Sequence, residues 1–409
     1  MTVHDRHDDS AGITAIAVTA LSMAAFVSAL SHRITDALLP RLASDFNLGL
    51  GAVSWAITSF TIGYALCQLL FGPIGDRYGK YLVIAWACVA SSVAALLCAL
   101  SPGLSLLLVA RAIAGGTTAA VIPLAMAWIG DVVPYERRQP VLARFLIGQI
   151  LGVSGGQLLG GLSSDYFGRH VPFFIISGLY LVSALLLFSV RRRLPAHALA
   201  TRHGEGHALQ HMWRELSLVF AQRWARVVIM TVFLEGALVF GAFAFFASHL
   251  HHALKVSMTA AGAIVMLFGF GGLLFAGASR RLVPRLGEMG LARWGSGIMM
   301  GALLIVALAP GVWFVVPACF AMGLGFYMLH NTLQTNATQM APERRGAAVS
   351  AFAFSYFLGQ SAGVGVAGWL VGYIGTPGVI FTSGVVVVLV ALNFIREKRV
   401  QLQVLPGKA

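Results

Sequence analysis

The sequence Gly72-Pro73-Ile74-Gly75-Asp76-Arg77-Tyr78-Gly79-Lys80 is a short polar turn between two long apolar runs, residues 51–72 and 81–100. A helix of about 20 apolar residues crosses a bilayer core about 30 Å thick, so each run is long enough to span a membrane. The glycines allow the close backbone approach of a tight turn. The stretch therefore predicts two membrane-spanning helices joined at the membrane surface.

The composition extends this interpretation to the whole chain. Of the 409 residues, 58% are apolar and only 11% are charged, whereas soluble domains have about 25% charged residues. A soluble globule of this size could not cover its surface with so few charges. We therefore predict an all-α polytopic membrane protein. Its twelve expected spanning helices are 13–37, 51–72, 81–100, 104–130, 140–162, 172–190, 226–248, 257–279, 292–309, 312–335, 346–370 and 378–395.

The basic residues are distributed unevenly between the loops. If both termini are cytoplasmic, all but five of the 28 Lys and Arg residues lie on the cytoplasmic side. The exceptions are Arg41, Arg169 and Lys255 outside, and Arg33 and Arg111 within helices. Cytoplasmic loops carry the basic excess in membrane proteins. We therefore expect a multi-pass protein of the inner or plasma membrane with both termini cytoplasmic, and the net charge of +13 needs no nucleic-acid partner.

The longest polar stretch, residues 191–225, divides the chain into two similar parts. We expect a cytoplasmic linker there, between an N-terminal six-helix bundle at 1–190 and a C-terminal one at 226–409. Its histidines show no fixed metal-ligand spacing, so no metal is expected. Several residues recur 207 or 208 positions later: Phe60 and Phe268, Gly63 and Gly271, Arg77 and Arg285, Gly79 and Gly287, Gly152 and Gly359, Gly156 and Gly363, Gly161 and Gly368. The recurrence predicts duplicated halves related by an axis normal to the membrane.

With these features the chain resembles the major facilitator superfamily. The segment 72–80 is similar to the loop signature between the family's second and third helices. Arg111 with Gly115 and Gly116 resembles the Arg-x-x-x-Gly pattern of proton-coupled exporters, although Ala114 replaces a Gln of that pattern. The resemblance implies the family's fold, with twelve transmembrane helices in two pseudo-symmetric six-helix bundles.

Two further elements resemble the family's drug/metabolite:proton antiporter branch. The segment Asp36 to Pro40 is similar to an Asp-x-x-x-Pro element at the end of the first helix of many exporters. Residues 148–161 resemble the glycine-rich antiporter motif, with Gln157 in place of its proline.

The resemblance also implies roles for loop and packing residues. Asp76 is expected to engage the other half when the cytoplasmic side is shut; the alternative is a solvated loop that only fixes topology. The gating loop comprises Gly72, Asp76, Arg77, Gly79 and Lys80. A packing stripe is formed by Gly148, Gly152, Gly156 and Gly160. Such a stripe lets another helix approach closely, and because the family's fifth helix lies against the opposite half, it is also expected to permit sliding.

Charges within the predicted spans are the main candidates for function, because each costs about 2.5–3.5 kcal/mol at a helix centre. Glu235 lies roughly 13 Å into the predicted helix 226–248, near the midplane, where transporters bind substrate and ions. A carboxyl there can take up a proton on one side and release it on the other as its hydration changes. Glu235 is therefore the first candidate for proton coupling. The alternative is a protonated or hydrogen-bonded packing residue.

Other polar residues are candidates for the substrate or proton site. Arg111 can attract an anionic substrate or tune a carboxylate, and a structural ion pair is the alternative. Arg33 and Asp36 are three residues apart and can pair on one helix face, which favours a structural role. His330 and Gln334 share a face and can line a pathway, with hydrogen bonding between helices as the alternative.

These features favour a secondary transporter over other classes. The sequence contains no Walker loop and no HExxH motif, so an enzyme is not expected. A channel needs a continuous polar lining, and the intramembrane charges are few and scattered. We expect a monomer that works by alternating access and exports a small amphipathic or apolar compound by proton antiport, with no cofactor besides the proton gradient. The alternatives are a proton-coupled importer of a metabolite such as an organic acid or sugar, and a non-translocating membrane sensor.

Overall fold

The computed structural model describes residues 3–199, 201 and 208–404, and their regular elements are helices. The N-terminal half contains α1 (Val3–Arg33), η1 (Asp36–Leu38), α2 (Leu39–Phe46), α3 (Leu50–Val53), α4 (Trp55–Tyr78), α5 (Lys80–Ala99), α6 (Leu104–Thr118), α7 (Val121–Val132), α8 (Tyr135–Leu162), η2 (Ser163–Phe167) and α9 (Val171–Arg191). The remaining elements are η3 (Ala196–Leu199), α10 (Ala208–Ala221), α11 (Arg223–Phe243), α12 (Phe246–Leu254), α13 (Met258–Leu308), α14 (Val312–Gln339), η4 (Pro342–Arg344) and α15 (Arg345–Val404).

The number of membrane spans is twelve, as predicted. Ten helical stretches in the described part of the chain are long and apolar enough to cross a membrane. Two of them, Met258–Leu308 and Pro342–Gln403, have 51 and 62 residues. Gly287 interrupts the first and Gly375 the second, each with a positive φ that turns the chain back. Each long stretch therefore holds two spans.

Glycine contacts in the two halves confirm the predicted duplication. A Cβ atom on Gly152 of α8 would collide with the Phe26 carbonyl oxygen of α1. In the other half, a Cβ on Gly359 of α15 would collide with the Phe233 carbonyl oxygen of α11. Both members of the second pair lie 207 positions after those of the first. The same helix faces therefore touch at the same depth in each half.

The positions of the turns repeat as well. Gly79 and Gly287, 208 positions apart, both have positive φ and begin the third span of their halves. Gly168 and Gly375, 207 positions apart, both have positive φ before the sixth span. Glycine adopts this conformation without the steric cost that a side chain brings. The internal symmetry thus includes the loops.

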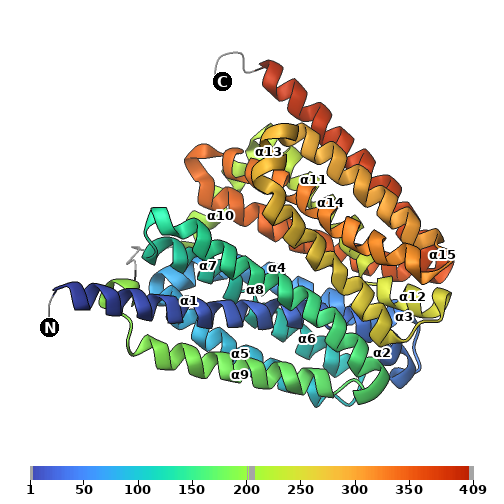
Figure 1. The fold of residues 1–409 in the computed structure, drawn as a ribbon, viewed down its shortest axis with the longest axis horizontal. Helices are drawn as coiled ribbons and strands as arrows, with labels where there is room; N and C mark the ends of the chain where they lie inside the picture. The colour runs from blue at the N-terminus through green and yellow to red at the C-terminus, as the bar shows by residue number, and fades with distance from the viewer. Residues whose placement is uncertain (1–2, 200, 202–207, 405–409) are drawn as a thin grey trace.

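The two halves meet at one end of the molecule, where α2, α3 and α12 lie, and their ribbons diverge towards the other end (Figure 1). We call these the narrow and the wide end. The halves contact each other through α8 with α13 and through α3 and α4 with α15. At the narrow end, Gly161 packs against Met258 and Gly368 against Gly51, again as symmetry-related pairs.

Some predicted boundaries were wrong. The helix expected at 13–37 ends at Arg33 and continues, after η1, as α2 to Phe46. The helix expected at 226–248 likewise ends at Phe243 and continues as α12. Apolar runs predict a span but not where its helix breaks, because both sides of the break remain apolar.

The predicted linker contains ordered structure on both of its described sides. Leu194 and Ala198 are buried in the core of the N-terminal half, and the Trp128 indole donates to the Ala198 carbonyl at 2.8 Å. In α10, Leu216 and Val219 are buried in the core of the C-terminal half. Residues 200 and 202–207, with His203 and His207, lie outside the described residues.

We predict that Gly115→Ala destabilises the protein whereas Gly130→Ala does not. A Cβ on Gly115 would overlap the Phe60 carbonyl oxygen, so the backbones of α4 and α6 must separate, while Gly130 has open space around it. Overpacking of this kind costs about 1–3 kcal/mol. Thermal melting of the purified variants in one detergent checks this. Equal melting temperatures would contradict the proposed backbone contact.

Candidate functional site

Arg33 and Asp36 lie where the first span is broken. Asp36 is buried, and its Oδ2 is 3.7 Å from Arg33 Nη1. Gln157 of α8 donates from Nε2 to the same oxygen at 2.9 Å. The structure therefore brings the two predicted residues together and adds an amide partner from α8.

Arg33 also reaches across to the other half. Its Nη2 donates to Gln360 Oε1 of α15 at 2.7 Å. Its guanidinium carbon lies 3.9 Å from the ring centroid of Phe240 in α11, which is cation–π geometry. A buried cation thus binds the first span to two helices of the C-terminal half.

Arg111 bonds backbone carbonyls and does not form a structural ion pair with a described residue. Its Nε donates to the Ala56 carbonyl and its Nη1 to the Ser31 carbonyl, both at 3.1 Å. Ser31 lies in the last turn of α1, where carbonyls lack helical partners. The described residues include no salt bridge to Arg111, and the side chain stabilises the broken end of α1.

Glu235 and His330, identified separately in the sequence, are hydrogen-bonded to each other. His330 Nδ1 of α14 lies 2.8 Å from Glu235 Oε2 of α11, and the Glu235 side chain is fully buried. The His330 ring packs against Tyr356 at 4.7 Å and Phe326 at 5.1 Å between centroids. Glu235 Oε1 has no hydrogen-bond partner among the described residues. The pair is thus a titratable site enclosed by aromatic rings.

Aromatic side chains connect this pair to Arg33. Tyr356 contacts His330 on one side and Phe240 on the other, with 5.9 Å between the centroids of Tyr356 and Phe240. The guanidinium of Arg33 lies over the ring of Phe240. The candidate site is therefore one cluster, which extends from α1 through α15 to α11 and α14.

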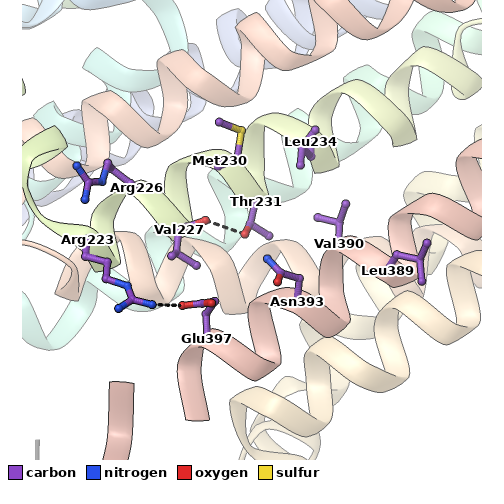
Figure 2. Close-up of a pocket in the computed structure, with 10 residues that line it drawn as sticks. All are labelled: Arg223, Arg226, Val227, Met230, Thr231, Leu234, Leu389, Val390, Asn393 and Glu397. Carbon is purple, nitrogen blue, oxygen red and sulfur yellow. Dashed lines mark hydrogen bonds and ion pairs between the residues drawn. The ribbon is translucent and has the colours of Figure 1, made fainter. Parts of the chain in front are cut away.

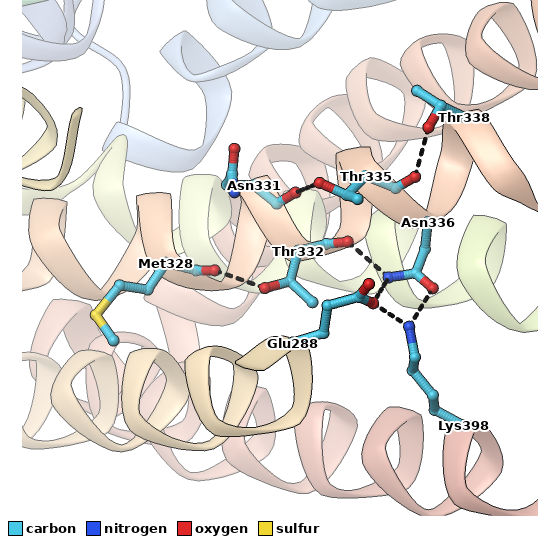
Figure 3. A network of polar contacts seen from close by, with 8 residues as sticks. All are labelled: Glu288, Met328, Asn331, Thr332, Thr335, Asn336, Thr338 and Lys398. Atoms are coloured by element: carbon cyan, nitrogen blue, oxygen red, sulfur yellow. Dashed lines mark hydrogen bonds and ion pairs between the residues drawn. The ribbon is translucent and has the colours of Figure 1, made fainter. Parts of the chain in front are cut away.

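Gln334 is exposed one turn beyond His330 towards the wide end. Asn336, on a different face of α14, belongs to a separate network (Figure 3). There it donates to Glu288 at 2.7 Å and accepts from Lys398 at 2.7 Å, and Lys398 also bonds Glu288. The network joins three spans of the C-terminal half near the wide end.

The gating loop forms the corresponding network of the N-terminal half. Lys80 Nζ is 2.6 Å from Asp131 Oδ2 and 3.1 Å from Asp76 Oδ1. Position 288, 208 residues after Lys80, is a glutamate, so the charge is reversed between the halves. The Arg77 guanidinium lies 5.3 Å from the ring of Tyr78, and Gly72 has open space around it. In this conformation Asp76 is bonded within its own half, and its engagement with the other half stays a prediction.

The predicted glycine stripe of α8 faces α1. Cβ atoms on Gly148, Gly152, Gly156 and Gly160 would meet the carbonyl oxygens of Ser22, Phe26, Leu30 and Ile34. A different face of α8 meets the opposite half, where Ser154 Oγ donates to the Met266 carbonyl at 3.1 Å. The stripe is therefore placed for packing within its own half. In this conformation it does not face the opposite half, so the expected sliding stays a prediction.

Asp165, which the sequence analysis did not identify, joins the halves at the narrow end. Its carboxylate accepts from the backbone N–H of Met258 at 3.2 Å and of Thr259 at 2.7 Å, and from the Thr259 hydroxyl at 2.7 Å. These are the first residues of α13, whose free N–H groups favour an anion. A carboxylate of one half thus caps a spanning helix of the other.

Gln360 and Tyr356 were also missed. A lone amide within the glycine-containing apolar run of residues 346–370 was a usable signal for Gln360, since a polar group in a span needs a partner. Nothing in the local sequence distinguishes Tyr356 from the other aromatics. Within the described residues, no group of three or more His, Cys, Asp and Glu side chains could hold a metal ion.

Residues 21–364 match the Major Facilitator Superfamily, and the chain belongs to this family of membrane transporters. It is 26% identical over 352 residues to the MFS-type transporter YceJ of Bacillus subtilis (strain 168), covering 84% of this chain and 86% of YceJ. It is 30% identical over 160 residues to the multidrug export protein EmrB of Escherichia coli (strain K12), covering 39% of this chain and only 31% of EmrB.

Solved structures share the fold. A bacterial homolog of the human lysosomal transporter Spinster, in an inward-facing and unoccupied conformation, superposes with a TM-score of 0.78 at 17% identity over 97% of this chain and 99% of that one. The nucleoside transporter NupG gives a TM-score of 0.73 at 14% identity over 93% of this chain and 98% of that one. At these identities the similarity is one of fold.

We predict that Asp165→Ala opens the narrow end. Hydrogen bonds to a charged group contribute about 1.5–3 kcal/mol, so losing them should shift the balance between joined and separated narrow ends by roughly tenfold or more. Spin labels at Gly103 and Gly311, both in open surroundings, report the separation in a background without the native cysteines. A larger population of long distances is expected.

Asp45→Ala is the matched control for this experiment. Asp45 is a carboxylate of the same end whose partners, Arg41 and Arg169, belong to its own half. An unchanged distance distribution in the Asp165 variant, or an equal change in both variants, would contradict the role assigned to Asp165.

Proposed function

We propose that this transporter exports a small amphipathic or apolar compound in exchange for protons. The Glu235–His330 pair carries the proposal, because it is a fully buried carboxyl hydrogen-bonded to an imidazole between two spans. Such a pair can hold an additional proton and later release it when water reaches the site. The similarity to the multidrug export protein EmrB supports export.

Coupling requires that the proton site lies where the halves meet. Tyr356 and Phe240 connect His330 to Arg33, the cation that bonds Gln360 across the halves. A change in charge at the pair therefore acts on the contact that joins α1 to the C-terminal half. The aromatic surfaces beside it favour an amphipathic or apolar substrate over a sugar.

We place the protein in the inner or plasma membrane. In the proposed orientation, its wide end faces the cytoplasm. The distribution of basic residues supports it, because Arg77, Lys80 and the arginines at 191–193 all lie at that end. Residues 1–190 and 226–409 then move as two bodies connected by the linker 191–225, within a monomer whose termini are both cytoplasmic.

In this scheme Asp76 serves as a latch. It pairs with Lys80 while the wide end is apart, and engages the opposite half when the wide end closes. Weak contacts suit this role, since a carboxylate at an exposed helix N-terminus contributes only about 0.3–1 kcal/mol and can be released in each cycle.

We predict that Glu235→Gln abolishes accumulation driven by a pH gradient in proteoliposomes but retains counterflow of labelled substrate. Glutamine preserves the shape and a hydrogen-bond acceptor but cannot exchange a proton. A substrate can be found first by thermal-shift screening, because a bound ligand stabilises the folded protein. Normal accumulation by this variant would rule out Glu235 as the proton carrier.

Glu288→Gln is the matched control, because Glu288 is a partly buried carboxylate of the same half held by Lys398 and Asn336. We expect it to lower the melting temperature and to leave the pH dependence of transport unchanged. Loss of proton coupling in both variants would show that the effect is not specific to Glu235 and would contradict its role as the proton carrier.

The direction of transport separates antiport from symport. In vesicles with a pH gradient, we expect substrate to accumulate in the compartment with the higher proton concentration, because an antiporter moves substrate against the flow of protons. Accumulation in the compartment with fewer protons would instead identify a symporter and therefore an importer. Absence of counterflow by the folded protein would support a sensor.

A further inference from the structure

A groove on the C-terminal half lies apart from the Glu235–His330 pair. It has a volume of about 570 Å³ and runs between the first turns of α11 and the part of α15 after Gly375 (Figure 2). Its lining residues are Arg223, Arg226, Val227, Met230, Thr231, Leu234, Leu389, Val390, Asn393 and Glu397. The proposed transport cycle assigns no role to this groove.

The lining changes character along the groove. Arg223 and Arg226 lie at its wide-end mouth, in the first turn of α11. The walls farther along are mostly apolar, with Thr231 and Asn393 as the polar residues. Met230 is 58% and Leu389 is 59% exposed. Exposed apolar side chains within membrane spans contact the acyl chains of the bilayer. The groove therefore has a cationic end at headgroup depth and an apolar end at acyl-chain depth.

The charges at the mouth are only partly compensated. Arg223 forms an ion pair with Glu397 at 3.2 Å. The Arg226 side chain has no salt bridge or hydrogen bond to any residue that the structure describes, and its guanidinium points away from α15 in Figure 2. The amide of Asn393 lies between the two helices in the same view and can donate to a phosphate. The mouth thus offers one uncompensated positive charge, and an amide donor lies farther along the groove.

A groove of the N-terminal half provides a contrast. It has a volume of about 420 Å³ and is lined by Phe71, Ile74, Tyr78, Leu82, Val83, Trp86, Ala87, Ala90 and Thr117. No arginine or lysine is among these lining residues. An apolar groove of this kind has no feature that selects one headgroup over another.

We propose that the groove between α11 and α15 binds an anionic phospholipid. Arg226 binds the phosphate, Asn393 can donate to a headgroup oxygen farther along the groove, and one acyl chain lies along Met230 and Leu389. Basic pockets between spanning helices on the cytoplasmic side bind anionic headgroups. This proposal does not depend on the direction of transport or on the proton site.

The test is native mass spectrometry of the purified full chain, titrated with phosphatidylglycerol, phosphatidylcholine or inorganic phosphate. We expect saturable binding of phosphatidylglycerol, and about fivefold weaker binding by Arg226→Gln, the loss expected for one arginine beside an anionic headgroup at about 1 kcal/mol. Leu389→Trp, which fills the apolar part and leaves the charges unchanged, should also weaken binding. Size-exclusion chromatography verifies that each variant is folded.

Arg285→Gln is the matched control, because Arg285 is an exposed basic residue of the same half outside the groove. Unchanged binding by this variant supports the proposal. An equal loss in Arg226→Gln and Arg285→Gln would indicate general attraction between charges and overturn it. Equal affinity for phosphatidylcholine would overturn the requirement for an anion. Saturable binding of inorganic phosphate that Arg226→Gln abolishes would overturn the assignment to a lipid.

Discussion

Close approach of helix backbones at glycine is the constraint on which each half of this protein depends. Lipid tails are as apolar as the side chains, so burial alone gives spanning helices little reason to associate, and close packing must supply the attraction. Gly152 and Gly156 bring α8 onto α1, and Gly359 and Gly363 bring α15 onto α11. A methyl group at any of these positions would meet a backbone carbonyl, which cannot move without moving its helix.

The charges of the candidate site do not follow the symmetry of this scaffold. The counterpart of Arg33, 207 positions later, is Phe240, on whose ring the Arg33 guanidinium lies. The counterparts of Glu235 and His330 in the first half are Ser28 and Ile122. Duplication thus provides two similar rigid bodies, whereas residues present only once provide a cation in one half and a titratable pair in the other.

The two ends of the molecule are held by different kinds of contact. At the narrow end, Asp165 and Arg33 bond residues of the opposite half, so these bonds must break if the halves separate there. Near the wide end, Lys80 and Glu288 bond partners within their own halves, so their networks can persist while the halves move. An exchange between two states needs breakable contacts between bodies and persistent contacts within them.

The sequence by itself determined the membrane spans, their number and the duplication, because hydrophobicity, glycine turns and repeats are written along the chain and a bilayer forces each apolar run into a helix. It also indicated Glu235, Arg33 and His330, because a charge within a span is costly. Only the tertiary structure decided the partners. Glu235 and His330 are 95 residues apart, and Arg33 and Gln360 are 327 apart. Which side chains meet at such separations depends on the rotation and depth of each helix, and these are fixed by the packing of many neighbours together.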